Sequence, residues 1–170
     1  MTSVRALLAA VAVSIALVLQ VSVFSYVSWQ GVVPNLVLLV VVGAALVKGS
    51  QFAMLLGFAA GVLLDLAPPA DHVAGRWALA LMVVGYVAGR VALDIKPTVG
   101  AALATVAASS FLGTSVFALS GLILRDPPLT VPDLLQVVAI SVVWDLVLAP
   151  FVLPLVMAMF QRLEPERART

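Results

Sequence analysis

The chain has 170 residues, 64% of them apolar and only 10% charged, with a formal net charge of +1 and a mean hydropathy of +1.21. Soluble domains average about 45–50% apolar and about 25% charged residues, so this composition excludes a soluble globular protein. The absence of cysteine also excludes a disulfide framework and thiolate chemistry.

The apolar residues form long runs rather than the alternating strands of about ten residues that build a membrane β-barrel, so helices are predicted. Turn signals divide these runs into six helices. Their expected bounds are about 4–25, 34–47, 51–66, 77–93, 98–124 and 132–160, followed by a short polar tail over 161–170. The second helix is expected to begin at Pro34, because the missing N–H of proline would have no partner in a first turn.

A helix needs about 20 residues to cross a bilayer, so six crossings and short loops use nearly the whole chain. The sequence therefore predicts an all-α integral membrane protein, a six-helix transmembrane bundle. Seven lysines and arginines fall on one side of this topology and only two on the other. The first group is Arg5, Lys48, Arg90, Lys96, Arg162, Arg167 and Arg169; the second is Arg76 and Arg125. The positive-inside rule then predicts that both termini are cytoplasmic.

Glycines spaced by four residues mark two of the predicted helices. Gly57, Gly61 and Asp65 share one face of the third helix, and Gly85 and Gly89 repeat the spacing in the fourth. Small residues at this spacing let helix backbones approach closely in a membrane. Two interpretations stay open: packing within one bundle, or a face that docks the helix of a partner.

Two carboxylates lie inside predicted membrane helices. Asp65 falls near the outer end of its helix, where we expect it to pair with Arg76 or to cap the following helix. Asp145 follows Asp133 by about 18 Å of helix, which places it near the bilayer midplane. An acid at that depth costs about 2.5–3.5 kcal/mol on the insertion scale. We therefore expect Asp145 to be neutral, or hydrogen-bonded to serine, threonine or tryptophan.

Asn35 and Trp144 complete the set of intramembrane polar residues, and Gln20 is expected to form a hydrogen bond between helices. Pro150 and Pro154 each remove a hydrogen bond from the last helix, so a kink is predicted there.

Residues for catalysis or cofactor binding are not evident. The sequence offers no nucleophile with a base, no metal-ligand cluster and no phosphate-binding loop, so we expect neither enzyme activity nor a metal nor a cofactor. The single histidine, His72, falls in a loop containing proline and glycine, where a solvated or headgroup-facing side chain is expected.

Four segments together resemble the rod shape-determining MreD family, and their order and spacing extend along nearly the full chain. They are Pro34-Asn35-Leu36-Val37-Leu38, the stretch from Gly57-Phe58 to Asp65-Leu66, Gly75-x-x-Ala78-Leu79 before Gly85-Tyr86, and Trp144-Asp145-x-x-Leu148-x-Pro150. The family often has Pro-Asp where this chain has Pro34-Asn35, and an aromatic-Asn pair where it has Trp144-Asp145. These exchanges alter charge while keeping polar groups at both places.

The resemblance implies a non-enzymatic, multi-pass subunit of the bacterial inner membrane that supports peptidoglycan elongation and cell shape. The implied partner is the bitopic protein MreC, and through it MreB and the synthase formed by RodA and a class B penicillin-binding protein. Membrane lipid is also an expected partner and self-association stays open, whereas nucleic acid is not an expected partner.

Another function class stays open: the substrate-binding membrane subunit of a vitamin importer of the energy-coupling-factor type, which is similar in helix number and size. Such a subunit needs several polar and aromatic groups that converge on one cavity. The candidates here are Asn35, Asp65, Trp77, Tyr86, Trp144 and Asp145. A small transporter or channel would need polar residues at several depths, and the sequence supplies few.

Overall fold

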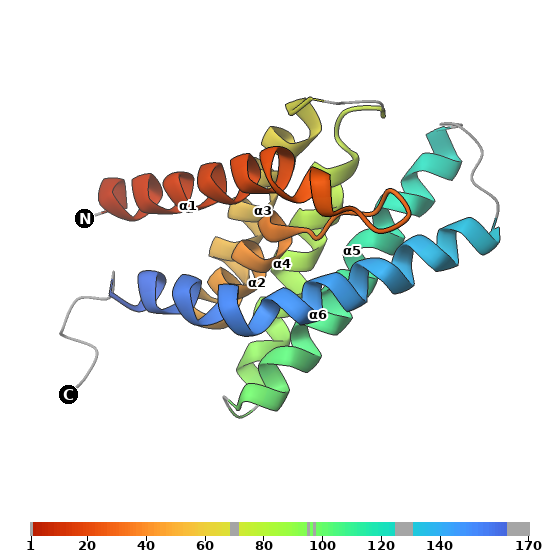
Figure 1. Ribbon diagram of the computed structural model, residues 1–170. Helices are drawn as coiled ribbons and strands as arrows, with labels where there is room; N and C mark the ends of the chain where they lie inside the picture. The colour runs from red at the N-terminus through yellow and green to blue at the C-terminus, as the bar shows by residue number, and fades with distance from the viewer. Residues whose placement is uncertain (1, 69–71, 95, 97, 125–130, 163–170) are drawn as a thin grey trace.

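The computed structural model describes residues 2–68, 72–94, 96, 98–124 and 131–162, and this part of the chain forms six α-helices and one short 3₁₀ helix (Figure 1). The elements are α1 (Thr2–Ser22), η1 (Phe24–Val27), α2 (Leu36–Lys48), α3 (Ser50–Leu66), α4 (Arg76–Asp94), α5 (Val99–Leu124) and α6 (Val131–Gln161). The predicted all-α class is confirmed. Most of the predicted tail, residues 163–170, lies outside the described residues.

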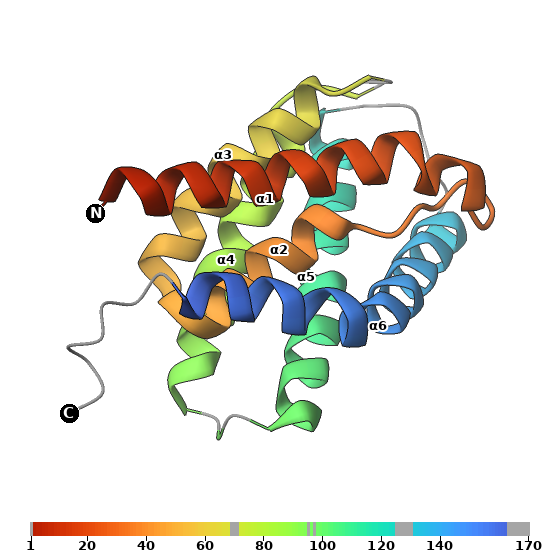
Figure 2. The ribbon, with the colours of Figure 1, turned by 60° about the vertical axis from the view of Figure 1, so that its left-hand side comes forward.

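Three helices are long and apolar enough to cross a membrane: α4, α5 and α6. The other three, α1, α2 and α3, are apolar but have shorter qualifying segments of 10–17 residues. In Figures 1 and 2 the helices cross one another steeply rather than forming a parallel bundle, and α1 packs against α2, α3 and α6.

The helix ends gather on two opposite sides of the molecule. The beginning of α1 and the end of α6 lie at the left of Figures 1 and 2, and the end of α4 lies at the bottom. The end of α1, the end of α3 and the end of α5 lie towards the top and right. Helices α3, α4 and α5 run between the lower and the upper side of Figure 1, whereas α2 begins at the buried Asn35.

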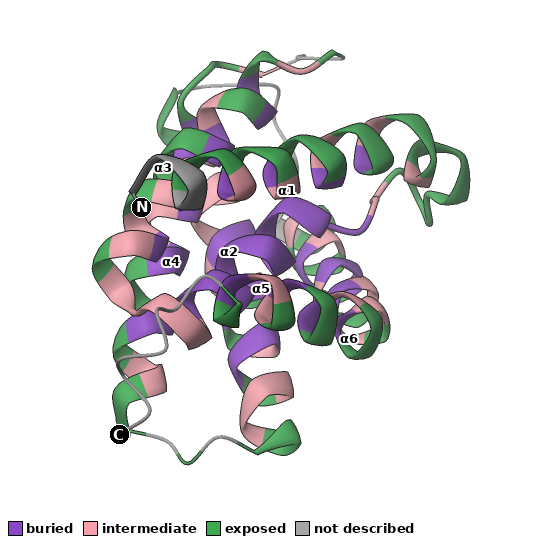
Figure 3. Ribbon diagram, turned by 90° about the vertical axis from the view of Figure 1, so that its left-hand side faces the viewer, coloured by how far each residue is buried: buried purple, intermediate pink, exposed green. Residues whose placement is uncertain are grey.

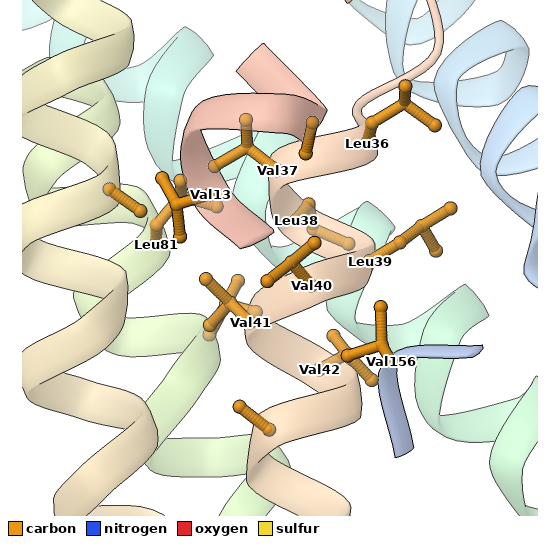
Figure 4. Packing of buried hydrophobic residues seen from close by; sticks show 14 of the residues in the cluster. Val13, Leu36, Val37, Leu38, Leu39, Val40, Val41, Val42, Leu81 and Val156 are labelled. Carbon is orange, nitrogen blue, oxygen red and sulfur yellow. The ribbon is translucent and has the colours of Figure 1, made fainter. Parts of the chain in front are cut away.

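Helix α2 occupies the centre of the protein. Its first ten residues, 36–45, are all buried, and α2 packs against α1, α3, α4, α5 and α6 (Figure 3). Figure 4 shows its aliphatic side chains surrounded by Val13 of α1, Leu81 of α4 and Val156 of α6. A helix that is apolar on all sides is expected to be buried on all sides, and in lipid such a core is stabilised by dispersion and close packing.

Helix α2 begins two residues later than predicted. Pro34 lies before the helix, and Asn35 is the N-cap, with φ −96° and ψ 81°, while its side chain accepts a hydrogen bond from Leu38 N at 2.9 Å. The prediction that Pro34 lies in the first turn is wrong because asparagine, a strong N-cap residue, sets the boundary.

The segment after α1 also differs from the prediction, since α1 ends at Ser22 rather than near residue 25 and η1 follows. A tight hairpin comes next, in which Trp29 and Val32 exchange backbone hydrogen bonds of 3.0 and 2.9 Å. Gln30 and Gly31 form its tip with φ values of 51° and 80°, the left-handed pair that two-residue hairpins prefer.

Helix α6 contains both Pro150 and Pro154 and is continuous over 31 residues. Figure 2 shows that α6 changes direction along its length, as expected for a helix that loses internal hydrogen bonds at proline. Its C-terminal half lies beside α1 and α2.

Candidate functional site

Asp145 lies at the most buried polar site of the described chain. Its side chain is fully buried, with 0% exposure, and both carboxylate oxygens accept hydrogen bonds. Oδ1 accepts from the backbone N–H of Asn35 at 2.8 Å, and Oδ2 accepts from the Ser110 hydroxyl at 2.6 Å. The carboxylate thus joins α6 to α5 and to the beginning of α2, which lies 110 residues away in sequence.

The beginning of α2 explains why an acceptor is needed there. The first N–H groups of a helix have no partner inside the helix, and the interior of a membrane protein supplies little water to replace one. Here the backbone N–H of Asn35 donates to Asp145, and that of Val37 donates to Gln20 Oε1 at 3.3 Å. The backbone N–H of Leu38 donates to the Asn35 side chain. Because negative charge is favourable at a helix N-terminus, a carboxylate suits this position.

Two donors beside this cluster have no acceptor among the described residues. They are the side-chain amide Nδ2 of Asn35 and the indole Nε1 of Trp144, and both atoms are buried. Buried donors of this kind usually meet an ordered water or another acceptor. The cluster therefore has hydrogen-bonding capacity beyond its present partners, although the structure does not bring these two donors to one shared cavity.

Asp65 has the same task at the beginning of α4. Its Oδ2 accepts from the N–H groups of Gly75 at 2.8 Å and Ala78 at 3.1 Å, and its Oδ1 accepts from Trp77 N at 3.0 Å. The predicted capping role is therefore present. The side chain is only 3% exposed, so these backbone donors are its partners in a buried site.

Aromatic side chains and Arg76 cover this cap. The Arg76 guanidinium donates to the Phe117 carbonyl from Nε at 3.3 Å and Nη2 at 2.8 Å, and lies 3.9 Å from the centre of the Phe117 ring. Trp77 stacks on the same ring at 4.4 Å, and His72 meets its edge at 5.1 Å while lying 3.8 Å from Asp65. This cluster fastens the α3–α4 connection to α5.

The four glycines of the predicted packing faces lie between α3 and α4. A Cβ added at any one of them would overlap with backbone atoms of the opposite helix. The overlaps are Gly57 with Leu81, Gly61 with Trp77 and Ala78, Gly85 with Ala53, and Gly89 with Ser50. Helices α3 and α4 therefore bury both glycine faces between them, so the glycines do not form an open surface for a partner.

Helix α5 contributes residues that the sequence reasoning did not single out. Its buried face carries small and hydroxyl-bearing residues, and Ser110 among them binds Asp145. The signal was present as a stripe at helical spacing, formed by Thr105, Ser109, Ser110, Gly113, Thr114 and Gly121. A hydroxyl stripe in an apolar helix indicates that a polar partner faces it.

Two apolar grooves flank the C-terminal half of α6. One lies between α6 and α1, has a volume of about 610 Å³, and ends near Arg162. The other lies between α6 and α5, has a volume of about 670 Å³, and ends near Lys96. Both volumes fall in the range of about 300–1,000 Å³ typical of ligand sites, but apolar residues form most of each lining.

The polar candidates do not converge on one pocket. Asp65 and Trp77 belong to the cluster at the start of α4, Asn35 and Asp145 belong to the cluster at the start of α2, and Tyr86 is 47% exposed on α4. Among the described residues, no three His, Cys, Asp or Glu side chains are placed to hold a metal ion.

Comparison with known proteins gives one family. The family model described as rod shape-determining protein MreD matches residues 1–163. No curated protein and no solved structure is matched. The vitamin importer alternative gains no support from these comparisons.

Proposed function

Because the chain belongs to the MreD family of rod shape-determining proteins, we propose that it is a non-enzymatic subunit of the bacterial machinery for peptidoglycan elongation, where it docks MreC. The family match over residues 1–163 carries the proposal, since it covers all six helices. Through MreC the protein would reach MreB and the synthase formed by RodA and a class B penicillin-binding protein.

In this proposal all six helices cross the inner membrane and both termini are cytoplasmic. Helix α3 runs between the same two sides as the longer helices, which supports this topology. Lys48 ends α2, Arg90 lies in the last two turns of α4, and Lys96 follows α4, so all three lie near the side that the positive-inside rule makes cytoplasmic.

The groove between α1 and α6 is the surface that suits a partner helix best. Its α1 wall is a single stripe at helical spacing, from Leu8 to Leu19, and its α6 wall runs from Phe151 to Arg162. Each wall is about 16 Å long at 1.5 Å per residue, or three helical turns, and α2 forms the floor. Glycine faces cannot serve here, because α3 and α4 already bury them.

The capped beginning of α2 gives this surface a fixed shape. Asp145 and Gln20 hold the N-terminus of α2, and α2 lies directly under the groove through Leu36 and Val40. A preorganised floor lowers the entropy cost of docking a partner helix. Binding MreC in one arrangement better than in another would then bias the state of the synthase, as any regulator with differential affinity does.

Co-purification tests the proposal. The tagged protein is expressed in place of the native copy and recovered in mild detergent as wild type, as Ala12→Trp, which fills the groove, and as Ala10→Trp, which lies on the exposed face of α1. We expect MreC with wild type and Ala10→Trp, and about tenfold less with Ala12→Trp.

Cell shape supplies the second measurement, since cells carrying Ala12→Trp should lose their rod form while those carrying Ala10→Trp keep it. Equal recovery of MreC with all three forms would contradict docking in this groove. Recovery of an ATPase pair with a scaffold subunit would contradict the proposed function as a whole.

A further inference from the structure

The second groove, between α5 and α6, differs from the first in how its polar groups are placed. Its walls are apolar along Ala101, Ala102, Leu153, Pro154 and Met157. Its polar residues gather where α4 ends and α5 begins, at Lys96 and Thr98. The groove is therefore amphipathic from end to end, with one cation at the mouth and hydrocarbon along its length.

The mouth offers more than the lysine. Thr98 lies directly before α5 and accepts a hydrogen bond from Ala101 N at 3.1 Å, so its side chain caps the helix. Val99, the first residue of α5, also lines the groove, so the N-terminus of this helix lies at the mouth. A helix N-terminus beside a lysine favours phosphate oxygens, while the lysine provides the charge.

Deeper in the groove the polar side chain of Thr105 is hydrogen-bonded within its own helix. Thr105 lines the wall, but its hydroxyl donates to the carbonyl of Ala101 at 2.8 Å within α5. The wall therefore presents methyl and methylene groups beyond the mouth. Such a surface matches an acyl chain attached to an anionic headgroup.

We propose that this groove binds an anionic phospholipid, with its phosphate at Lys96 and Thr98 and an acyl chain along α5 and the C-terminal half of α6. The α6 wall runs from Ala149 to Met157, about 12 Å at 1.5 Å per residue. This apolar wall ends at the lysine and the hydroxyl of Thr98, so it matches the acyl chain and the phosphate of such a lipid.

Lipid titration of the detergent-purified full chain tests the inference. Native mass spectrometry counts the bound molecules as phosphatidylglycerol or phosphatidylcholine is added. We expect phosphatidylglycerol to bind the wild-type protein more tightly. Lys96→Ala should weaken that binding about fivefold, the change that about 1 kcal/mol produces, whereas Arg90→Ala removes an exposed charge outside the groove and should leave it unchanged.

A second pair of variants tests the acyl-chain wall. Ala101→Trp fills the groove and should abolish retention of either lipid, whereas Ala104→Trp lies on the exposed face of α5 and should leave it intact. Because Lys96 is exposed, its variant is expected to fold, so the charge test stands even if Ala101→Trp does not.

The proposal is overturned if the two lipids bind equally to the wild-type protein, or if Lys96→Ala and Arg90→Ala weaken phosphatidylglycerol binding to the same extent. A photocrosslinker at Met157 that captures another protein in membranes, in place of lipid, would also overturn it.

Discussion

Replacing Asp145 tests whether this side chain stabilises the protein by capping α2 or only by filling space. Asp145→Leu keeps similar bulk but removes both acceptors, leaving the Asn35 N–H and the Ser110 hydroxyl without their partner. A buried donor without a partner costs about 1–3 kcal/mol. The hydroxyl can turn to the carbonyl of Val106 one turn earlier, so we expect a total loss of about 2–4 kcal/mol.

Asp145→Asn should behave differently, because its amide retains one oxygen for the Asn35 N–H and can donate from Nδ2 to the Ser110 oxygen. Because the amide keeps both hydrogen-bond partners, we expect the free energy of unfolding to fall by only about 1 kcal/mol. At about 2–4 °C per kcal/mol, the melting temperature falls by about 2–4 °C for asparagine and about 4–16 °C for leucine.

The assay is thermal unfolding of the detergent-purified protein followed by intrinsic tryptophan fluorescence. Val143→Leu, on the exposed face of the same helix, serves as the matched control and should melt with the wild type. Equal melting temperatures for the leucine and asparagine variants would refute the capping argument, as would a leucine variant as stable as the wild type.

Three further predictions follow from the same contacts. Asp65→Ala removes the acceptor of three backbone N–H groups at the start of α4 and should lower stability by about 2–4 kcal/mol, with Asp65→Asn between it and the wild type in the same melting assay. Equal melting of all three forms would contradict this. Gly61→Ala should destabilise the protein strongly, because its Cβ would overlap the backbone of Ala78, whereas Ala59→Val on the exposed face of α3 should be neutral. The yield of monodisperse protein in size-exclusion chromatography distinguishes the two variants. Equal yields would contradict close packing of α3 against α4. Asn35→Asp alone places two acids at the start of α2 and should lower the melting temperature. Adding Asp145→Asn should restore most of the lost melting temperature, because the exchanged pair keeps an acceptor at both places. A double variant less stable than both single variants would show that the two residues cannot be exchanged.

Much of the fold could be predicted from the sequence because its signals are local. Long apolar runs, prolines and charged turns predict six helices whose bounds differ from the observed ones by at most three residues. The start of α2 was missed at Pro34 because the capping geometry of Asn35, rather than proline, decides the boundary. The hairpin at Gln30-Gly31 is short and lies between two helices, where apolar periodicity carries no signal.

The roles of the carboxylates depended on contacts between distant segments. Four-residue spacing showed that Gly57, Gly61 and Asp65 share a face, but only the fold places α4 against that face. A capping role could be anticipated for Asp65 because the next helix follows it closely. Asp145 serves a helix that begins 110 residues earlier, and no local pattern connects the two.

Asp145 and Asp65 have the same structural role at two helix beginnings. Helices α2 and α4 both begin where bulk water is scarce, and each receives a carboxylate from another helix to accept its first N–H groups. Engaged carboxylates of this kind are poorly placed to act as acid or base catalysts, which agrees with the non-enzymatic role that we propose.

Site-specific photocrosslinking in living cells tests the proposed docking most directly. A photoreactive amino acid at Ile15 lies in the groove between α1 and α6, and one at Phe58 lies on the exposed face of α3. The account predicts that Ile15 crosslinks to the membrane helix of MreC and that Phe58 does not. Crosslinking of MreC from Phe58 alone, or from neither position while the two proteins still co-purify, would contradict it.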